Sequence, residues 1–92
     1  MEDTVDTTPA VQIFSKDNCA PCVRAKRLLD SMGVRYAVVD LTGDLDGMMR
    51  VARMTGRTTL PQIVVGNELI GGLDDLAIAI NNPRIREALL AA

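Results

Sequence analysis

Cys19 and Cys22 are the two residues of this chain whose type and spacing best suit chemistry, because only Ala20 and Pro21 separate them. A polar loop precedes the pair and an amphipathic pattern follows it, so we expect Cys19 at the N-terminus of a helix. Unpaired backbone N–H groups and the helix dipole stabilise a thiolate there and lower its pKa from about 8.5 toward neutrality. Cys22 lies nearly one turn further along, within reach of a disulfide on Cys19. We predict that Cys19 is an exposed redox nucleophile and that Cys22 is the resolving thiol.

A metal site and a buried structural pair are the alternatives for these cysteines. Zinc needs about four ligands, and two thiols in a chain without histidine supply only half of them. We therefore expect no metal site within one chain, although a dimer would be able to share one. The absence of histidine also excludes nucleophiles activated by imidazole. The polar loop before Cys19 favours exposure of its thiol, and with it a redox function over a structural one.

Composition limits the other classes of function. The chain has 92 residues, 48% of them apolar, which suits one compact domain with a single core. Its net charge is −2 and it holds one Phe, one Tyr and no Trp, which argues against nucleic-acid binding. No apolar run approaches the roughly 18 to 20 residues that span a bilayer, and residues 1–9 do not resemble a signal peptide. We expect a disordered lead-in over residues 1–9 and one domain over 10–92, in a cytoplasmic monomer without nucleic-acid or membrane partners.

The elements that position the cysteines are predicted from the spacing of apolar residues. Residues 11–14 and 34–39 are typical of strands. Between them, a helical pattern begins at Cys22 and ends at Gly33. Two strands joined by a helix form a βαβ unit with parallel strands. The cysteines are therefore expected at the junction between the first strand and the first helix.

The second half of the chain supplies the remaining elements. The pattern predicts a helix over 45–56, strands over 62–65 and 68–70 around a Gly66-Asn67 turn, a helix over 73–80 and a short helix that begins at Pro83. On the first of these helices, Leu45, Met48, Met49 and Ala52 recur at helical spacing. We expect its methionines to fill the core rather than bind a cofactor. The order predicts an α/β fold, a four-stranded mixed β-sheet flanked by helices, which resembles the thioredoxin fold.

Two further segments resemble the motifs of glutaredoxins. They are Arg57-Thr58-Thr59-Leu60-Pro61-Gln62-Ile63 and Ile70-Gly71-Gly72-Leu73-Asp74-Asp75-Leu76. With the segment from Lys16 to Cys22 they make three separated motifs in the family's order, and the resemblance runs from about Val11 to Leu90. It implies a dithiol oxidoreductase that reduces protein disulfides and glutathione mixed disulfides. Glutathione is then a cosubstrate, and no cofactor is tightly bound.

The resemblance also implies where glutathione binds. Pro61 is expected to be a cis-proline opposite the cysteines, and the backbone of Leu60 to pair with the cysteinyl part of glutathione as an added strand does. Gly71 and Gly72 allow close backbone approach, and Asp75 is expected as a dipole partner in the first turn of a helix rather than a contact. At the other end, the positions of Lys16 and Arg53 match the family's groups for the glycine carboxylate, with Arg57 a weaker candidate. The implied glutathione site consists of Lys16, Arg53, Thr59, Leu60, Pro61, Gly72, Leu73 through its N–H and Asp74 through its side chain.

The Ala20-Pro21 dipeptide departs from the Pro-Tyr that is usual in dithiol glutaredoxins and leaves two alternatives open. A small residue after the first cysteine is found in members that hold a [2Fe-2S] cluster, to which each protomer of a dimer contributes its Cys19 and one glutathione. Pro21 is similar to the Gly-Pro of thioredoxin and favours a redoxin that thioredoxin reductase reduces and that donates electrons to ribonucleotide reductase. Because Pro21 has no N–H, we also expect the Cys22 N–H to donate directly to the Cys19 thiolate.

Overall fold

The computed structural model describes residues 10–92, so the lead-in predicted over residues 1–9 lies outside the described residues. Strands and helices follow one another in the predicted order. They are β1 (Val11–Ser15), α1 (Ala20–Ser31), β2 (Ala37–Asp40), α2 (Leu45–Thr55), β3 (Gln62–Val65), β4 (Glu68–Gly71), α3 (Leu73–Ala79) and α4 (Pro83–Leu90). None of the helices formed by residues 10–92 is long and apolar enough to cross a membrane.

The four strands form one mixed sheet in the order β2-β1-β3-β4. β1 lies inside the sheet, parallel to β2 and antiparallel to β3, so that Ile13 is level with Val38 on one side and Ile63 on the other. β3 and β4 form the expected antiparallel hairpin. The predicted fold, a four-stranded mixed sheet with the helix arrangement of the thioredoxin fold, is therefore confirmed.

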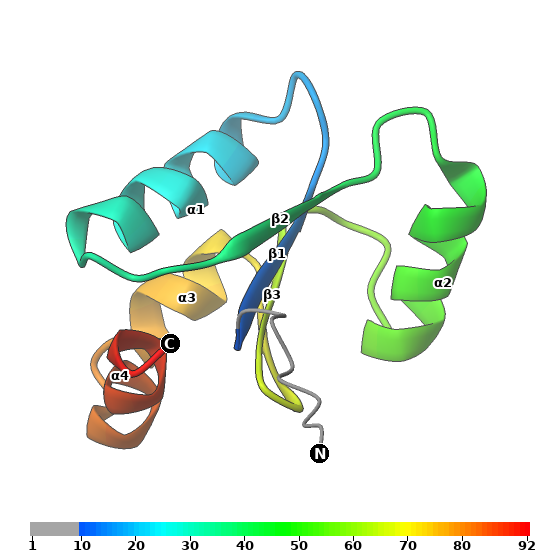
Figure 1. Ribbon diagram of the computed structural model, residues 1–92. Helices are drawn as coiled ribbons and strands as arrows, with labels where there is room; N and C mark the ends of the chain where they lie inside the picture. The colour runs from blue at the N-terminus through cyan, green and yellow to red at the C-terminus, as the bar shows by residue number, and fades with distance from the viewer. Residues whose placement is uncertain (1–9) are drawn as a thin grey trace, which may run out of the picture.

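Helices cover the two faces of the sheet unequally (Figure 1). α1, α3 and α4 pack on one face, where successive inward positions of β1 contribute Val11 and Ile13 to the main core. Residues that alternate with these point to the opposite face. There Phe14 packs with Leu41 and with Val51 of α2. α1, which carries the cysteines, is thus anchored on the face with the larger core.

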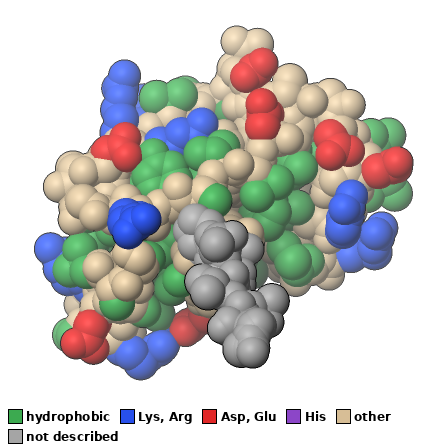
Figure 2. Space-filling model, viewed as in Figure 1, with side chains coloured by type: hydrophobic (Ala, Val, Ile, Leu, Met, Phe, Trp, Pro, Cys, Tyr) green, Lys and Arg blue, Asp and Glu red, His purple; other side chains and the backbone are tan. Residues whose placement is uncertain are grey.

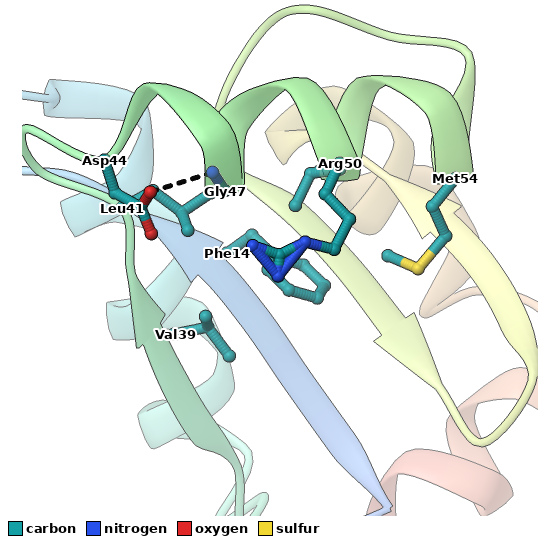
Figure 3. Close-up of a pocket in the computed structure, with 8 residues that line it drawn as sticks. Phe14, Val39, Leu41, Asp44, Gly47, Arg50 and Met54 are labelled. Atoms are coloured by element: carbon teal, nitrogen blue, oxygen red, sulfur yellow. Dashed lines mark hydrogen bonds between the residues drawn. The ribbon is translucent and has the colours of Figure 1, made fainter.

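α2 is the one helix among the described residues on the other face of the sheet, and it covers that face incompletely. A hollow of about 190 Å³ remains between α2 and the sheet. Figure 3 shows Arg50 and Met54 projecting from α2 into this hollow, toward Phe14. The helix begins at Asp44, whose side chain accepts a hydrogen bond from the Gly47 N–H at 2.8 Å.

The prediction that the methionines of this helix fill the core is wrong for Met49 and holds only in part for Met48. Leu45 is 70% exposed and Met49 is 51% exposed, while Met48 is partly buried against Phe14 and its neighbours. A single helix on a sheet face buries only the side that contacts the sheet, here Gly47 and Val51. The spacing of apolar residues identifies the helix, but it does not reveal whether another helix or strand covers its outer side.

β2 begins at Ala37, later than the predicted start at residue 34. The N–H of Val34 donates to the carbonyl oxygen of Leu29 at 3.0 Å, and that of Gly33 to Asp30 at 3.0 Å. These bonds close the C-terminal end of α1. The buried side chain of Val34 belongs to the core, but its backbone is committed to the helix end and does not join the sheet.

Candidate active site

Cys19 is the N-cap residue of α1. Its backbone is extended, with φ −124° and ψ 98°, and its Sγ atom accepts a hydrogen bond from the Cys22 N–H at 3.3 Å. The two cysteines form a disulfide whose Cα atoms are 5.2 Å apart. The N-terminus of a helix is where backbone N–H groups lack partners within the helix. The Cys22 N–H thus already reaches the Cys19 sulfur in the disulfide state, and its donation to the Cys19 thiolate stays a prediction.

The prediction that Cys19 is exposed is wrong for the disulfide state. Cys19 is 7% exposed and Cys22 is 1% exposed. The segment before Pro61 covers Cys19 from the opposite side of the site, where the carbonyl oxygen of Leu60 lies 3.6 Å from the Cys19 Sγ. Cys19 is nevertheless the more exposed residue of the pair, as the first attacker must be.

The loop between β1 and α1 presents Cys19 through a tight turn. Asn18 has a positive φ of 55°, a conformation that Asn tolerates better than most residues. The Asp17 N–H donates to Thr42 Oγ1 at 2.8 Å, and the Thr42 N–H donates to Asp40 at 2.9 Å. The loop after β1 is therefore tied to the loop after β2. Sequence reasoning missed Asn18 and Thr42, although an Asn directly before the first cysteine is itself a signal for a turn.

The opposite wall is the segment that leads into β3. The Leu60–Pro61 peptide bond is cis, as predicted. Gln62 is fully buried, and its Nε2 donates to the carbonyl oxygen of Thr59 at 2.9 Å. This bond fixes the backbone of the two residues before Pro61. Gln62 belongs to one of the sequence motifs, and its burial gives it a positioning role that the motif does not reveal.

The third wall is the turn from β4 into α3. Asp75 accepts hydrogen bonds from the Gly72 N–H at 2.9 Å and from Arg57 at 2.6 Å. The Gly72 N–H and, secondarily, the Arg57 guanidinium lower the pKa of the Asp75 carboxyl. Asp75 is thus a first-turn partner of its own helix, as expected. Arg57 joins the segment before Pro61 to this turn through the same carboxylate.

The two glycines of this turn differ in what they require. Gly71 has a φ of +116°, and a Cβ there would collide with the Asp75 carboxylate. A Cβ at Gly72 would meet the Pro61 carbonyl oxygen at 3.5 Å and the Asp75 carboxylate at 3.9 Å, which are ordinary contacts. The expectation of close approach therefore holds at Gly71, where the protein itself fills the space. At Gly72 the missing side chain leaves room in the groove instead.

These walls enclose a groove of about 380 Å³ beside the cysteines. Its lining consists of Pro21, Arg24, Arg57, Thr59, Leu60, Pro61, Gly72, Leu73, Asp74 and Asp75. The structure thus brings together six of the predicted glutathione-site residues, those from Thr59 to Pro61 and from Gly72 to Asp74. Lys16 and Arg53 are both exposed, and neither lines the groove. Arg24 lines it from α1 and was missed, because a basic residue on a helix reads as a solvated side chain.

The family model for glutaredoxins matches residues 11–70 of this chain. The chain belongs to the glutaredoxin family. It is 36% identical to glutaredoxin-C6 of rice over 84 residues, which cover 88% of this chain and 73% of the rice protein. It is 41% identical to glutaredoxin 3 of Escherichia coli K12 over 66 residues, covering 72% of this chain and 80% of that one. A buckwheat glutaredoxin solved in complex with glutathione superposes with a TM-score of 0.79 at 30% identity, covering 88% of this chain and 76% of the buckwheat chain.

As a glutaredoxin, the protein is a thiol-disulfide oxidoreductase, and Cys19–Cys22 is its redox-active disulfide. Within residues 10–92, no group of three or more His, Cys, Asp or Glu side chains is placed to hold a metal ion. The [2Fe-2S] alternative draws its ligands from two protomers and two glutathiones. It therefore stays a prediction from the sequence, as does reduction by thioredoxin reductase.

Proposed function

We propose that this glutaredoxin reduces protein disulfides and glutathione mixed disulfides with glutathione as its electron donor. One observation carries the proposal. The sulfur of Cys19 lies at the N-terminus of α1 and beside a groove of about 380 Å³ whose wall contains the backbone of Leu60. That volume is within the range of about 300 to 1,000 Å³ that is usual for small-molecule sites. A ligand in this groove has its reacting atom next to the nucleophile.

The groove offers charges and backbone groups that suit a zwitterionic tripeptide. Arg24, Arg57 and Asp74 all line the groove, so that carboxylates and an ammonium group find opposite charges. The backbone of Leu60 is placed to pair with the cysteinyl residue of glutathione. The glutathione complex of the buckwheat glutaredoxin supports this assignment. Lys16 and Arg53 both lie outside the groove. Their predicted contacts with the glycine carboxylate of glutathione remain part of the proposal.

The reaction with a glutathione mixed disulfide takes two exchanges. The Cys19 thiolate attacks the glutathionyl sulfur, a Cys19–glutathione disulfide forms, and the protein thiolate leaves and takes up a proton from water. The thiolate of a second glutathione then attacks the glutathionyl sulfur on Cys19. Glutathione disulfide leaves and the Cys19 thiolate is restored. The two electrons that reduce the mixed disulfide therefore come from glutathione and end on the released protein thiol, and glutathione disulfide is the oxidised product.

Protein disulfides are reduced through both cysteines. The Cys19 thiolate attacks one sulfur of the substrate and releases the other as a thiolate. The Cys22 thiolate then attacks the Cys19 sulfur, which frees the second substrate thiolate and leaves the Cys19–Cys22 disulfide. Two glutathione molecules reduce that disulfide and become glutathione disulfide. A cytoplasmic location, where glutathione keeps thiols reduced, suits this cycle and is part of the proposal.

The test compares two electron donors. A glutathionylated peptide is reduced by the purified protein with NADPH, glutathione and glutathione reductase, and in parallel with NADPH and thioredoxin reductase alone. We expect NADPH consumption only in the first mixture. Turnover only in the second would overturn the proposal and favour the thioredoxin-like interpretation of Pro21.

A further inference from the structure

A second depression borders the segment that leads into Pro61. It has a volume of about 190 Å³, and its lining consists of Leu45, Met48, Met49, Ala52 and Thr58. We call it the α2 hollow, and it is distinct from the hollow of similar volume between α2 and the sheet. Its four helical residues lie on the side of α2 opposite Arg50 and Met54, which point toward Phe14 in Figure 3. The helical period of 3.6 residues requires this separation of the two faces.

The α2 hollow is apolar and open to solvent. Leu45 and Met49 are among the most exposed large apolar side chains of the described residues, and Figure 2 shows hydrophobic side chains reaching the surface over α2. Within residues 10–92, no charged side chain lines the hollow. Methionine adapts its shape to different apolar partners. The hollow therefore suits an apolar side chain of varied shape and does not suit a carboxylate.

The α2 hollow lies near the active site. Thr58 belongs to its lining and lies two residues before Leu60, whose carbonyl oxygen is 3.6 Å from the Cys19 sulfur. An extended chain advances about 3.3 Å per residue. A peptide that is bonded to Cys19 and leaves it in the direction of Thr58 therefore carries the residue two positions from its cysteine about 7 Å away, close to the hollow.

We propose that the α2 hollow binds an apolar side chain of a protein substrate, two positions from the cysteine that becomes bonded to Cys19. This inference rests on the proposed reduction of protein disulfides. An apolar cavity of about 150 Å³ holds a benzene molecule, so the hollow of about 190 Å³ accepts one Leu or Phe side chain. Glutathione has no apolar side chain to place there. The hollow therefore discriminates among protein substrates and leaves glutathione itself unaffected.

The experiment measures one turnover without glutathione. Reduced protein is mixed with a symmetrical peptide disulfide, and the released peptide thiol is quantified by rapid quench and chromatography. Three peptides are compared: Ser-Ser-Cys-Ser-Ser, and the same peptide with Leu two positions before or two positions after the cysteine. At subsaturating concentration we expect one Leu peptide to react about fivefold faster than the Ser peptide, from partial burial of the side chain.

The Leu45→Gln/Met49→Gln double variant should bring that ratio to within about twofold while the Ser peptide reacts at the wild-type rate. Both side chains are exposed, so the variant is expected to fold, and its far-UV circular dichroism checks this. Ile78→Gln is the matched control, since Ile78 is 72% exposed on the opposite face of the sheet. It should leave the preference intact.

Three results would overturn the inference: equal rates for all three peptides with the wild type, a Leu preference that survives the double variant, or a wild-type dimer that the double variant abolishes. The last would assign the hollow to a second copy of this chain. Because the assay contains no glutathione, each of these results is distinguishable from a failure of glutathione-dependent turnover.

Discussion

The Cys19 sulfur and the carbonyl oxygen of Leu60 are 3.6 Å apart, although 41 positions separate the two residues in the sequence. Any group that bonds to Cys19 must therefore lie alongside the backbone that leads into Pro61. The site depends on two loops held in register, one after β1 and one before β3.

Gln62 is expected to act on substrate binding more than on stability. In Gln62→Met, the carbonyl oxygen of Thr59 loses its donor, so the backbone of residues 59–60 is less well fixed. The same change removes a buried Oε1 that has no partner among the described residues, which offsets the lost hydrogen bond. We predict a free energy of unfolding within about 1 kcal/mol of the wild type and a KM for a glutathionylated peptide raised about fivefold. Urea unfolding and steady-state kinetics check the two parts, and an unchanged KM would contradict the role given to Gln62.

Gly71 and Gly72 form a matched pair for the turn before α3. Gly71→Ala forces a side chain into a backbone with φ +116° and against the Asp75 carboxylate. It should lower the free energy of unfolding by about 1 to 3 kcal/mol. Gly72→Ala meets only ordinary contacts and should change the free energy by less than about 0.5 kcal/mol. Thermal unfolding of both variants decides this, and equal losses would show that the turn is not fixed by Asp75.

Asp75 should give the protein a pH-dependent share of its stability. Its pKa in the folded protein is lowered from the ordinary aspartate value by the Gly72 N–H and then by Arg57. The stabilisation is therefore complete above the ordinary pKa and is lost as the pH falls through the lowered one. Asp75→Asn should be less stable than the wild type by about 0.5 kcal/mol at pH 7, because the group is partly exposed and screened. The difference should shrink toward zero in strong acid. Urea unfolding of both proteins at pH 7 and at low pH tests the sign, and a difference that grew on acidification would contradict it.

Asn18 should be replaceable by Gly but not by Ala. Its positive φ of 55° costs most L-residues roughly 1 to 2 kcal/mol, less for Asn and nothing for Gly. We predict that Asn18→Ala lowers the free energy of unfolding by about 1 kcal/mol and that Asn18→Gly leaves it nearly unchanged. Chemical denaturation measures both. Equal stability of the two variants would show that the turn before Cys19 rearranges.

Local patterns in the sequence were sufficient for the elements and the redox pair. Apolar periods and turn residues predict all four strands and four helices, since these signals act over a few neighbouring residues. Contacts between residues far apart in the sequence could not be predicted in this way. The Asp17–Thr42 hydrogen bond joins loops 25 residues apart, and no local pattern announces it. Likewise the resemblance favours Arg53 over Arg57, but the turn after α2 directs Arg57 to Asp75 and the groove, which Arg53 does not line.

The exposed side of α2 is a second feature that the sequence pattern alone does not predict. Leu45 and Met49 recur at the spacing of a buried helix face, yet they remain at the surface. A helical period reveals that a face is apolar, whereas what covers that face depends on the other layers. In this glutaredoxin no described helix lies outside α2, and the apolar face remains at the surface.

The most direct test of the account is turnover of a glutathionylated peptide by Cys19→Ser and Cys22→Ser, assayed with glutathione, glutathione reductase and NADPH. The account predicts that Cys22→Ser keeps activity within a few fold of the wild type, because glutathione itself resolves the disulfide on Cys19. It predicts that Cys19→Ser retains none above the uncatalysed rate. Activity in Cys19→Ser together with its loss in Cys22→Ser would contradict the assignment of Cys19 as the nucleophile.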